Sequence, residues 1–298
     1  MDVIVLIKEV PDLNVYVEVE PKTLKVDPDD IMHIPNPCDL ISLRLAVTFI
    51  QELGDGCVTS LLLGPKQAKR TLRKCLDYGA DRAIHLLYEN INELENHQIA
   101  FIIKEAISIM NLPYDLIFTG CSYAGGSFAN GSIGTQVGTY LGLLQVSQVV
   151  RIKPRQGHND LIFECALDFG DQVTIKCCPP LLLTIHSDAE QIVYPSFARS
   201  LEALNIRVKS VDLTDLHLDP LKIEKRTSLL SCCAPRPRPK KVFTPKNSLS
   251  AAEKIRLIMS GGLEKKKSDF LEGSPEELAK YITDFLVQKG MLDQKLVR

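Results

Sequence analysis

The chain has 298 residues, of which 45% are hydrophobic and 24% are charged, and its 35 lysines and arginines nearly balance its 37 acidic residues. This is the composition of a globular protein, so it excludes intrinsic disorder, and a balanced charge disfavours nucleic acid as a partner. The longest apolar runs are too short to cross a bilayer, so no membrane span is predicted.

Nine cysteines are present without any Cys-x-x-Cys motif, and two vicinal pairs stand at Cys177-Cys178 and Cys232-Cys233. These spacings do not suit a closed metal site, and the six histidines do not cluster, so no metal site is predicted. We expect reduced, mostly buried thiols in a cytoplasmic protein, with redox sensing or metal binding as the alternatives.

The first 190 residues alternate apolar runs with segments of helical period. Val3–Ile7 is apolar at every position, which is typical of a strand that is buried on both faces. Further strands are predicted at 57–63, 83–87 and 115–119, and helices at 39–53, 66–78, 98–110 and in a segment that ends near 140. This alternation predicts an α/β fold, an open, mostly parallel Rossmann-like sheet with helices on both faces.

The character of the chain then changes twice. Segments 149–153, 161–167 and 172–176 predict an antiparallel hairpin at the sheet edge, and 179–185 predicts a return to a buried strand. After residue 222 the chain is basic and rich in proline, and Ser274-Pro275 with Glu277 predicts a capped helix that ends near 288. We therefore divide the chain into an α/β domain over 1–221 and a C-terminal arm ending in a helix over 222–298.

The loop after the 115–119 strand, Gly120–Gly134, is rich in glycine and serine. Glycines let backbone N–H groups approach a phosphate, and hydroxyls add neutral donors, so the loop favours an anion; an ordinary flexible loop is the alternative. It lacks both the Gly-Lys-Ser/Thr of a P-loop and the Gly-x-Gly-x-x-Gly of a dinucleotide fingerprint.

Two other turns are candidates for ligand contact. In Asn36-Pro37-Cys38-Asp39, Asp39 is a candidate helix N-cap and Asn36 a donor to a ribose or a base, although a simple turn with a cap explains the same residues. The backbone of the turn at 63–68 is suited to line an adenine. No nucleophile–base pair is evident, so the residues predict a nucleotide-binding α/β protein without catalytic side chains.

The order of these segments resembles the beta subunit of electron transfer flavoproteins over essentially the whole chain. The matching segments are 5–11, 36–39, 64–73, 78–85, 115–120, 180–184 and 194–196. The resemblance implies a heterodimer with a homologous alpha subunit that carries most of the FAD site, while this chain binds AMP or a second FAD. Such a heterodimer shuttles electrons between a dehydrogenase and an acceptor oxidoreductase. A structural or sensor protein of the same fold is the alternative.

The resemblance also implies a set of nucleotide contacts in this chain. They are Leu6, Asn36, Pro37, Cys38, Asp39, Leu63, Gly120, Ser122, Tyr123, Ala124, Gly125, Ser127, Asn130, Gly131 and Ser132. The family loop is acidic where this chain reads Ala124–Phe128 without a carboxylate, and the choice between AMP and a second FAD stays open.

Partner contacts are implied at two places. A recognition loop corresponds to Tyr194–Arg199, with Phe197 as the apolar anchor for partner dehydrogenases and Tyr194 beside it. The alternative is that Phe197 packs within its own chain. The C-terminal arm and its helix are expected to wrap around the alpha subunit.

Overall fold

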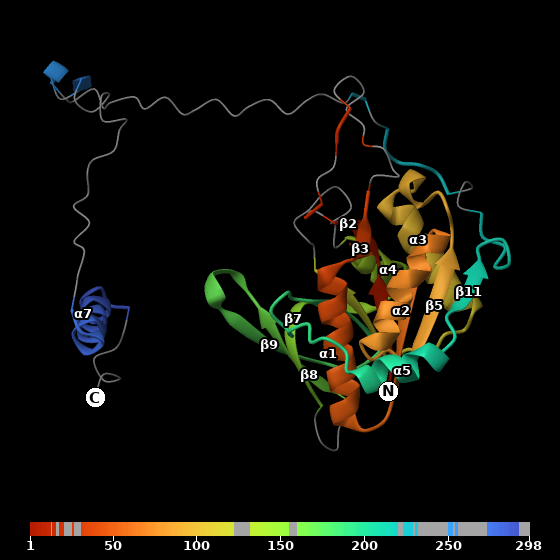
Figure 1. The fold of residues 1–298 in the computed structure, drawn as a ribbon, viewed down its shortest axis with the longest axis horizontal. Helices are drawn as coiled ribbons and strands as arrows, with labels where there is room; N and C mark the ends of the chain where they lie inside the picture. The colour runs from red at the N-terminus through yellow and green to blue at the C-terminus, as the bar shows by residue number, and fades with distance from the viewer. Residues whose placement is uncertain are drawn as a thin grey trace. The chain divides into compact units, whose positions relative to one another are not determined.

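The computed structural model describes residues 1–12, 14–15, 18–20, 26, 31–121, 132–154, 160–219, 223–228, 230–231, 250–252, 254–255 and 273–291. They belong to two compact units, Met1–Ala234 and Pro235–Arg298 (Figure 1). No helix in these described ranges is both long and apolar enough to cross a membrane.

A nine-stranded sheet forms the centre of the first unit, in the order β11-β5-β4-β1-β6-β10-β7-β8-β9. Its strands are β1 (Asp2–Ile7), β4 (Cys57–Gly64), β5 (Arg82–Leu87), β6 (Leu116–Gly120), β7 (Leu144–Pro154), β8 (Leu161–Ala166), β9 (Gln172–Cys177), β10 (Leu181–Ile185) and β11 (Lys209–Asp212). Neighbours from β11 to β7 pair in parallel, whereas β7, β8 and β9 pair antiparallel. The predicted α/β class, with a mostly parallel sheet and an antiparallel edge, is confirmed.

Helices cover both faces of this sheet (Figure 1). They are α1 (Pro37–Leu53), α2 (Lys69–Asp77), α3 (Asn96–Ile109), α4 (Ser132–Leu141) and α5 (Phe197–Asn205), with short 3-10 turns η2 (Lys66–Ala68), η3 (Ile91–Glu93) and η4 (Asp168–Gly170). One apolar cluster joins the sheet to α1, α2 and α5, and a second joins it to α3 and α4. The two clusters are the two sides of a three-layer sandwich.

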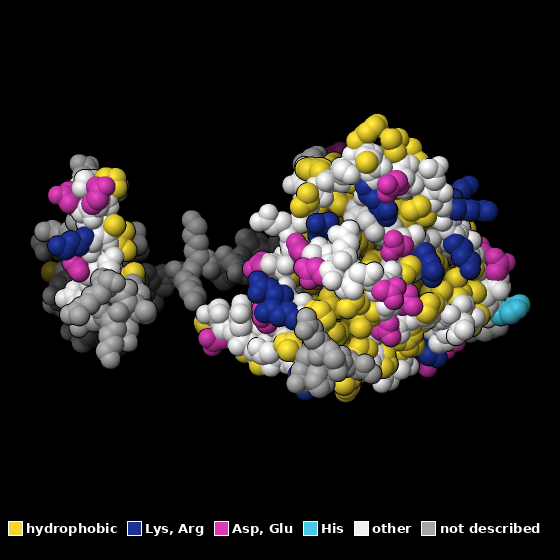
Figure 2. Space-filling view, turned by 90° about the horizontal axis from the view of Figure 1, so that it is seen from below, with side chains coloured by type: hydrophobic (Ala, Val, Ile, Leu, Met, Phe, Trp, Pro, Cys, Tyr) yellow, Lys and Arg dark blue, Asp and Glu magenta, His cyan; other side chains and the backbone are white. Residues whose placement is uncertain are grey.

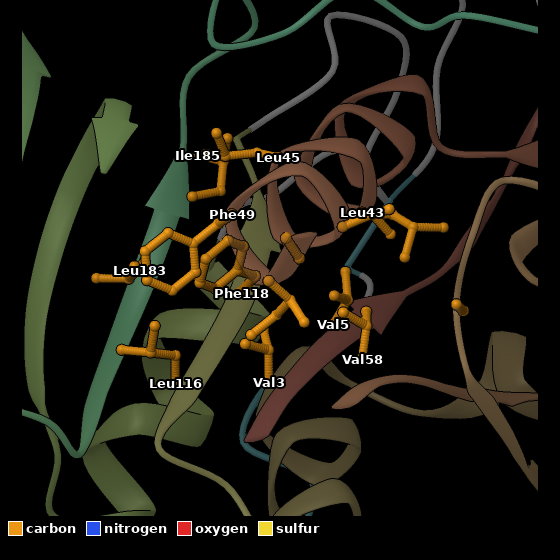
Figure 3. Packing of buried hydrophobic residues seen from close by; sticks show 14 of the residues in the cluster. Val3, Val5, Leu43, Leu45, Phe49, Val58, Leu116, Phe118, Leu183 and Ile185 are labelled. Atoms are coloured by element: carbon orange, nitrogen blue, oxygen red, sulfur yellow. The ribbon is translucent and has the colours of Figure 1, made fainter. Parts of the chain in front are cut away.

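Strand β1 shows why its sequence is apolar throughout. Val3 and Val5 belong to the cluster under α1, while Ile4 and Leu6 belong to the cluster under α3 and α4. Side chains alternate between the faces of a strand, so a strand with helices on both sides needs apolar residues at every position. In the first cluster, Phe49 of α1 points toward the strands that carry Phe118 and Leu183 (Figure 3).

The sequence did not indicate four elements of the first unit. These are the small sheet of β2 (Glu9–Pro11) and β3 (His33–Pro35), the helix α5, and the edge strand β11. Phe197 was expected in a loop, but it is the first residue of α5. The hydroxyl of Ser196 accepts a hydrogen bond from the Arg199 N–H and caps this helix.

The described part of the second unit contains the helix α7 (Pro275–Gln288). Its predicted capping box is present, because the Ser274 hydroxyl accepts from the Glu277 N–H and the Glu277 carboxylate accepts from the Ser274 N–H. None of its residues is buried, and Tyr281, Ile282 and Phe285 are exposed. The predicted domain boundary after residue 221 stays a prediction.

Candidate functional site

The chain changes direction in the sheet at β1. From β1 it proceeds to β4 and β5 on one side, and it then crosses to β6 and β10 on the other. Open α/β sheets bind ligands beyond the carboxyl ends of the strands at such a switch point. A cavity of about 340 Å³ lies there, walled by the ends of β1, β4 and β6.

The cavity wall combines an apolar side with polar groups. Apolar contacts come from Leu6, Ile7, Pro11, Ile31, Leu62, Leu63, Pro65, Ala68, Ile91, Ile99, Ile103 and Ile133, and polar or charged groups from Lys8, Glu9, His33, Asp39, Glu89, Asn92, Asn96 and Thr119. A wall of mostly apolar residues with a few convergent polar groups is typical of a small-molecule site.

Asp39 connects the ends of two strands at this wall. One carboxylate oxygen accepts the Lys8 N–H at 3.0 Å, and the other accepts the Gly120 N–H at 3.1 Å. Lys8 follows β1, Gly120 ends β6, and Asp39 stands in the first turn of α1 and is 3% exposed. A single side chain therefore bridges the backbone at the ends of β1 and β6, which are paired neighbours in the sheet.

Burial governs the charge of this carboxyl group. Desolvation raises the pKa of Asp39 to about 6, while the Lys8 ammonium and the two backbone donors oppose the shift. The same burial lowers the pKa of Lys8, and the charge of Asp39 opposes that change.

This shift predicts a pH dependence of stability. Between the ordinary value of 3.8 and about 6, native Asp39 holds a proton that the unfolded chain has already released. The unfolding free energy should therefore fall as pH rises through this window. Urea unfolding of the wild type and of Asp39→Asn, measured between pH 4 and pH 7, isolates the effect, because asparagine does not titrate. Identical pH slopes for the two proteins would contradict the assignment.

Two glycines permit close approaches around the cavity. A Cβ atom on Gly120 would lie 2.5 Å from the Cys38 carbonyl carbon and 2.7 Å from the Asp39 nitrogen. A Cβ atom on Gly134, in the first turn of α4, would overlap the Thr119 side chain, with its Oγ1 at 2.6 Å. Only glycine lets β6 approach α1 and α4 this closely.

The structure brings four predicted ligand residues, Leu6, Asp39, Leu63 and Gly120, onto the cavity wall. Asn36, Pro37 and Cys38 are not among the residues that line the cavity. Asn36, rather than Asp39, is the N-cap of α1, with its side-chain oxygen 3.4 Å from the Cys38 N–H. The expectation that Asp39 caps the helix is therefore wrong, because the helix begins at Pro37.

Ser132 begins α4, and its hydroxyl accepts a hydrogen bond from the Asn96 side chain at 3.1 Å. It is followed by Ile133 and Gly134, which reach the wall. The remaining predicted contacts lie outside the described residues: Ser122, Tyr123, Ala124, Gly125, Ser127, Asn130 and Gly131. Nucleotide contact by all of these positions stays a prediction.

Sequence reasoning missed the side of the wall that comes from η3 and the start of α3. Asn92, Asn96 and Ile99 reach the cavity because α3 packs beside α4 across the sheet face. Asn92 stands in η3, and the spacing of Asn96 and Ile99 on α3 is that of any amphipathic helix, so no local signal marks them as cavity residues.

Glu95 links the start of α3 to a distant segment. Its carboxylate accepts the Arg226 N–H at 3.0 Å, and the N–H and hydroxyl of Thr227 at 2.9 and 2.6 Å. It also caps α3 in a capping box with Gln98, whose amide donates to the Ile223 carbonyl at 2.8 Å. These donors, with the Thr227 hydroxyl first, lower the pKa of Glu95 to about 2. Residues 223–227 are thus hydrogen-bonded to the first turn of α3, which also contributes Asn96 to the cavity wall.

The predicted partner residues are solvent-exposed. Tyr194 is 90% and Phe197 is 79% exposed. Leu204, near the end of α5, is also exposed. Figure 2 views the underside of the first unit in Figure 1, where α5 lies, and shows hydrophobic side chains gathered between acidic and basic ones. Within the described part of the chain, Phe197 does not pack into its own core, contrary to the alternative considered for it.

The fold and the cavity define an α/β protein with a ligand-sized site at the switch point of its sheet. Comparison with known proteins agrees with this class. Residues 23–216 match the model of the electron transfer flavoprotein domain. The "Electron transfer flavoprotein subunit beta" of Thermoanaerobacterium thermosaccharolyticum is 32% identical over 220 residues, which are 74% of this chain and 81% of that protein.

Two further relatives have comparable coverage. "Protein FixA" of Bradyrhizobium diazoefficiens is 28% identical over 263 residues, or 86% of each chain. The "Electron transfer flavoprotein subunit beta" of Methylophilus methylotrophus is 28% identical over 222 residues, 73% of this chain and 81% of that protein. The chain belongs to the electron transfer flavoprotein family and is of its beta-subunit type, as its sequence motifs predicted. Its role is therefore that of an electron transfer flavoprotein component.

Proposed function

We propose that this chain is the beta subunit of a heterodimeric electron transfer flavoprotein and that its own cavity holds an adenine nucleotide. A homologous alpha subunit carries the FAD that exchanges electrons with a dehydrogenase and an acceptor oxidoreductase. The flavin supplies the redox chemistry when bound, and this chain positions the complex against its partners. The cavity at the ends of β1, β4 and β6 is the observation that carries the proposal.

The cavity residues fit an adenine nucleotide. The isoleucines of η3 and α3 give an apolar wall for the base, and Asn92, Asn96 and Thr119 offer hydrogen bonds to polar atoms. Lys8 and the N-terminus of α4 offer positive charge to a phosphate, beside the acidic residues Glu9, Asp39 and Glu89 of the same wall. At about 340 Å³ the cavity is near the lower end of the volumes typical of small-molecule sites, which favours AMP over a second FAD.

The heterodimer is supported by exposed apolar side chains on α7. Tyr281, Ile282 and Phe285 form an exposed stripe on α7, and an amphipathic helix of this kind gains stability by docking. We assign this helix and the arm before it to the surface of the alpha subunit.

Nucleotide analysis of the intact complex tests the proposal. The chain is co-expressed with a homologous alpha subunit, the complex is purified, and the nucleotides released on denaturation are quantified by mass spectrometry. We expect one FAD and one AMP per heterodimer. Two FAD molecules would place the chain in the electron-bifurcating type. A well-folded monomer that neither joins an alpha subunit nor retains an adenine nucleotide would refute the proposal, and nucleotide without flavin would favour the sensor alternative.

The exposed anchor gives a separate prediction. Phe197→Ala should lower kcat/KM for reduction of the complex by its partner dehydrogenase about tenfold, because a large exposed aromatic is the type of residue that dominates interfaces. Bound nucleotide should not change. Phe169→Ala is the matched control, since Phe169 is fully exposed in the turn between β8 and β9, at the antiparallel edge of the sheet. Equal kinetics for the two variants would remove the anchor assignment.

A further inference from the structure

Two cysteines that are far apart in the sequence meet at the cavity. Cys38 is the second residue of α1, and Cys121 directly follows β6. Their Sγ atoms are 3.6 Å apart. Cys121 is half-buried and lines the cavity, whereas Cys38 is not among the lining residues and is 6% exposed. The Cys121 thiol is accessible from the cavity, and the Cys38 thiol contacts the Cys121 thiol.

The backbones that carry these thiols are already in contact. The hypothetical Cβ of Gly120, the residue before Cys121, would lie 2.5 Å from the Cys38 carbonyl carbon. The N–H of Cys121 donates to the Ile185 carbonyl at 3.0 Å, and that of Gly120 donates to Asp39. A disulfide requires its two Cα atoms within about 7 Å and Cβ vectors that converge. The contact between the two Sγ atoms shows that the vectors converge here.

We propose that Cys38 and Cys121 are a redox-active dithiol that forms a reversible disulfide at the cavity wall. The oxidant is a small-molecule disulfide. The Cys121 thiolate attacks one sulfur of that disulfide, forms a mixed disulfide and releases the first thiolate. The Cys38 thiol then loses its proton and attacks the Cys121 sulfur, which releases the second thiolate. Two protein thiols are oxidised, one external disulfide is reduced to two thiols, and a bond joins α1 to β6.

The surroundings assign the two roles. The hydrogen bond with the Cys38 thiol lowers the pKa of Cys121, and the Ser187 N–H acts in the same direction against the effect of burial. That hydrogen bond and burial raise the pKa of Cys38. The nearby charges are those of Asp39 and Lys8. Since the thiolate is the nucleophile, Cys121 attacks first and Cys38 resolves the mixed disulfide.

The experiment treats the full-length, reduced chain with oxidised glutathione and maps its cysteines by non-reducing digestion and mass spectrometry. We expect a peptide cross-linked through Cys38 and Cys121, lost again on treatment with dithiothreitol. Cys38→Ser should retain glutathione on Cys121, because the resolving thiol is absent. Cys75→Ser is the matched control and should still form the cross-link, since Cys75 is fully buried and burial raises its pKa to about 12.

Two results with the folded wild type would overturn the proposal. The first is glutathione retained on Cys121 in the presence of Cys38. The second is a Cys38–Cys121 pair that stays reduced while the exposed Cys178 is modified. Because both are read from the wild-type chain, neither depends on whether a variant folds. Neither depends on bound nucleotide, so the test stands apart from that of the proposed function.

Discussion

Replacing Asp39 with alanine is expected to lower the free energy of unfolding by about 3 kcal/mol and to abolish AMP binding. The change leaves the N–H groups of Lys8 and Gly120 without their acceptor in a buried place. Hydrogen bonds to a charged group are each worth about 1.5 to 3 kcal/mol, partly offset here by the cost of burying the carboxylate. Urea unfolding and calorimetric titration with AMP measure the two effects.

Asp115→Ala is the matched control. Its carboxylate accepts the Asp2 N–H at 2.8 Å, so it also joins β1 to β6, but at the end of the sheet opposite the cavity. It has one backbone donor instead of two, and we expect a loss of about 1 kcal/mol with AMP binding retained. Loss of AMP binding in both variants would mean that Asp39 acts only through overall stability.

Replacing Gly134 with alanine is expected to destabilise the protein by about 2 kcal/mol and to weaken AMP binding. The new methyl group would overlap the Thr119 side chain, which is held in β6, so α4 must move away from the cavity wall. Alanine also improves helix propensity by about 1 kcal/mol, so the measured loss understates the steric effect.

Gly138→Ala, one turn further along α4, separates the two contributions. Its Cβ would meet the end of the Gln145 side chain at 3.0 Å and a Leu182 methyl group at 3.1 Å, both of which adjust more readily than Thr119. We expect this variant to be nearly neutral in stability and unchanged in AMP binding. If Gly134→Ala behaved like Gly138→Ala, the approach of α4 to β6 would not determine the shape of the cavity.

The sequence predicts the inner strands of the central sheet well because each of them carries a local apolar pattern. Val3–Ile7 is apolar at every position since both of its faces are covered, and the Ser274 capping box marks a helix start without any tertiary contact. The short elements were missed because their stability is tertiary. Edge strand β11 is partly exposed and gains its place by pairing with β5, and Arg199 of α5 is held by the carbonyl groups of Leu76 and Ala80.

The site was predictable where the chain carries a turn signal. Asp39 and Gly120 were predicted at the ends of strands and the starts of helices, which converge at one edge of an α/β sheet, and both line the cavity, while their contact with a nucleotide stays a prediction. That Asp39 holds the backbone N–H groups of Lys8 and Gly120, and that Cys38 meets Cys121, depends on the packing of α1 against β6, which no local pattern encodes.

Glu95 joins two segments of the chain through one carboxylate. The same side chain fixes the first turn of α3, next to Asn96 on the cavity wall, and receives the backbone of Arg226 and Thr227 where the chain departs toward its C-terminal arm. If a ligand in the cavity tilted α3, the backbone of Arg226 and Thr227 would therefore move with it. Conversely, a partner that displaced residues 226 and 227 would act on the cavity wall through Glu95 and the start of α3.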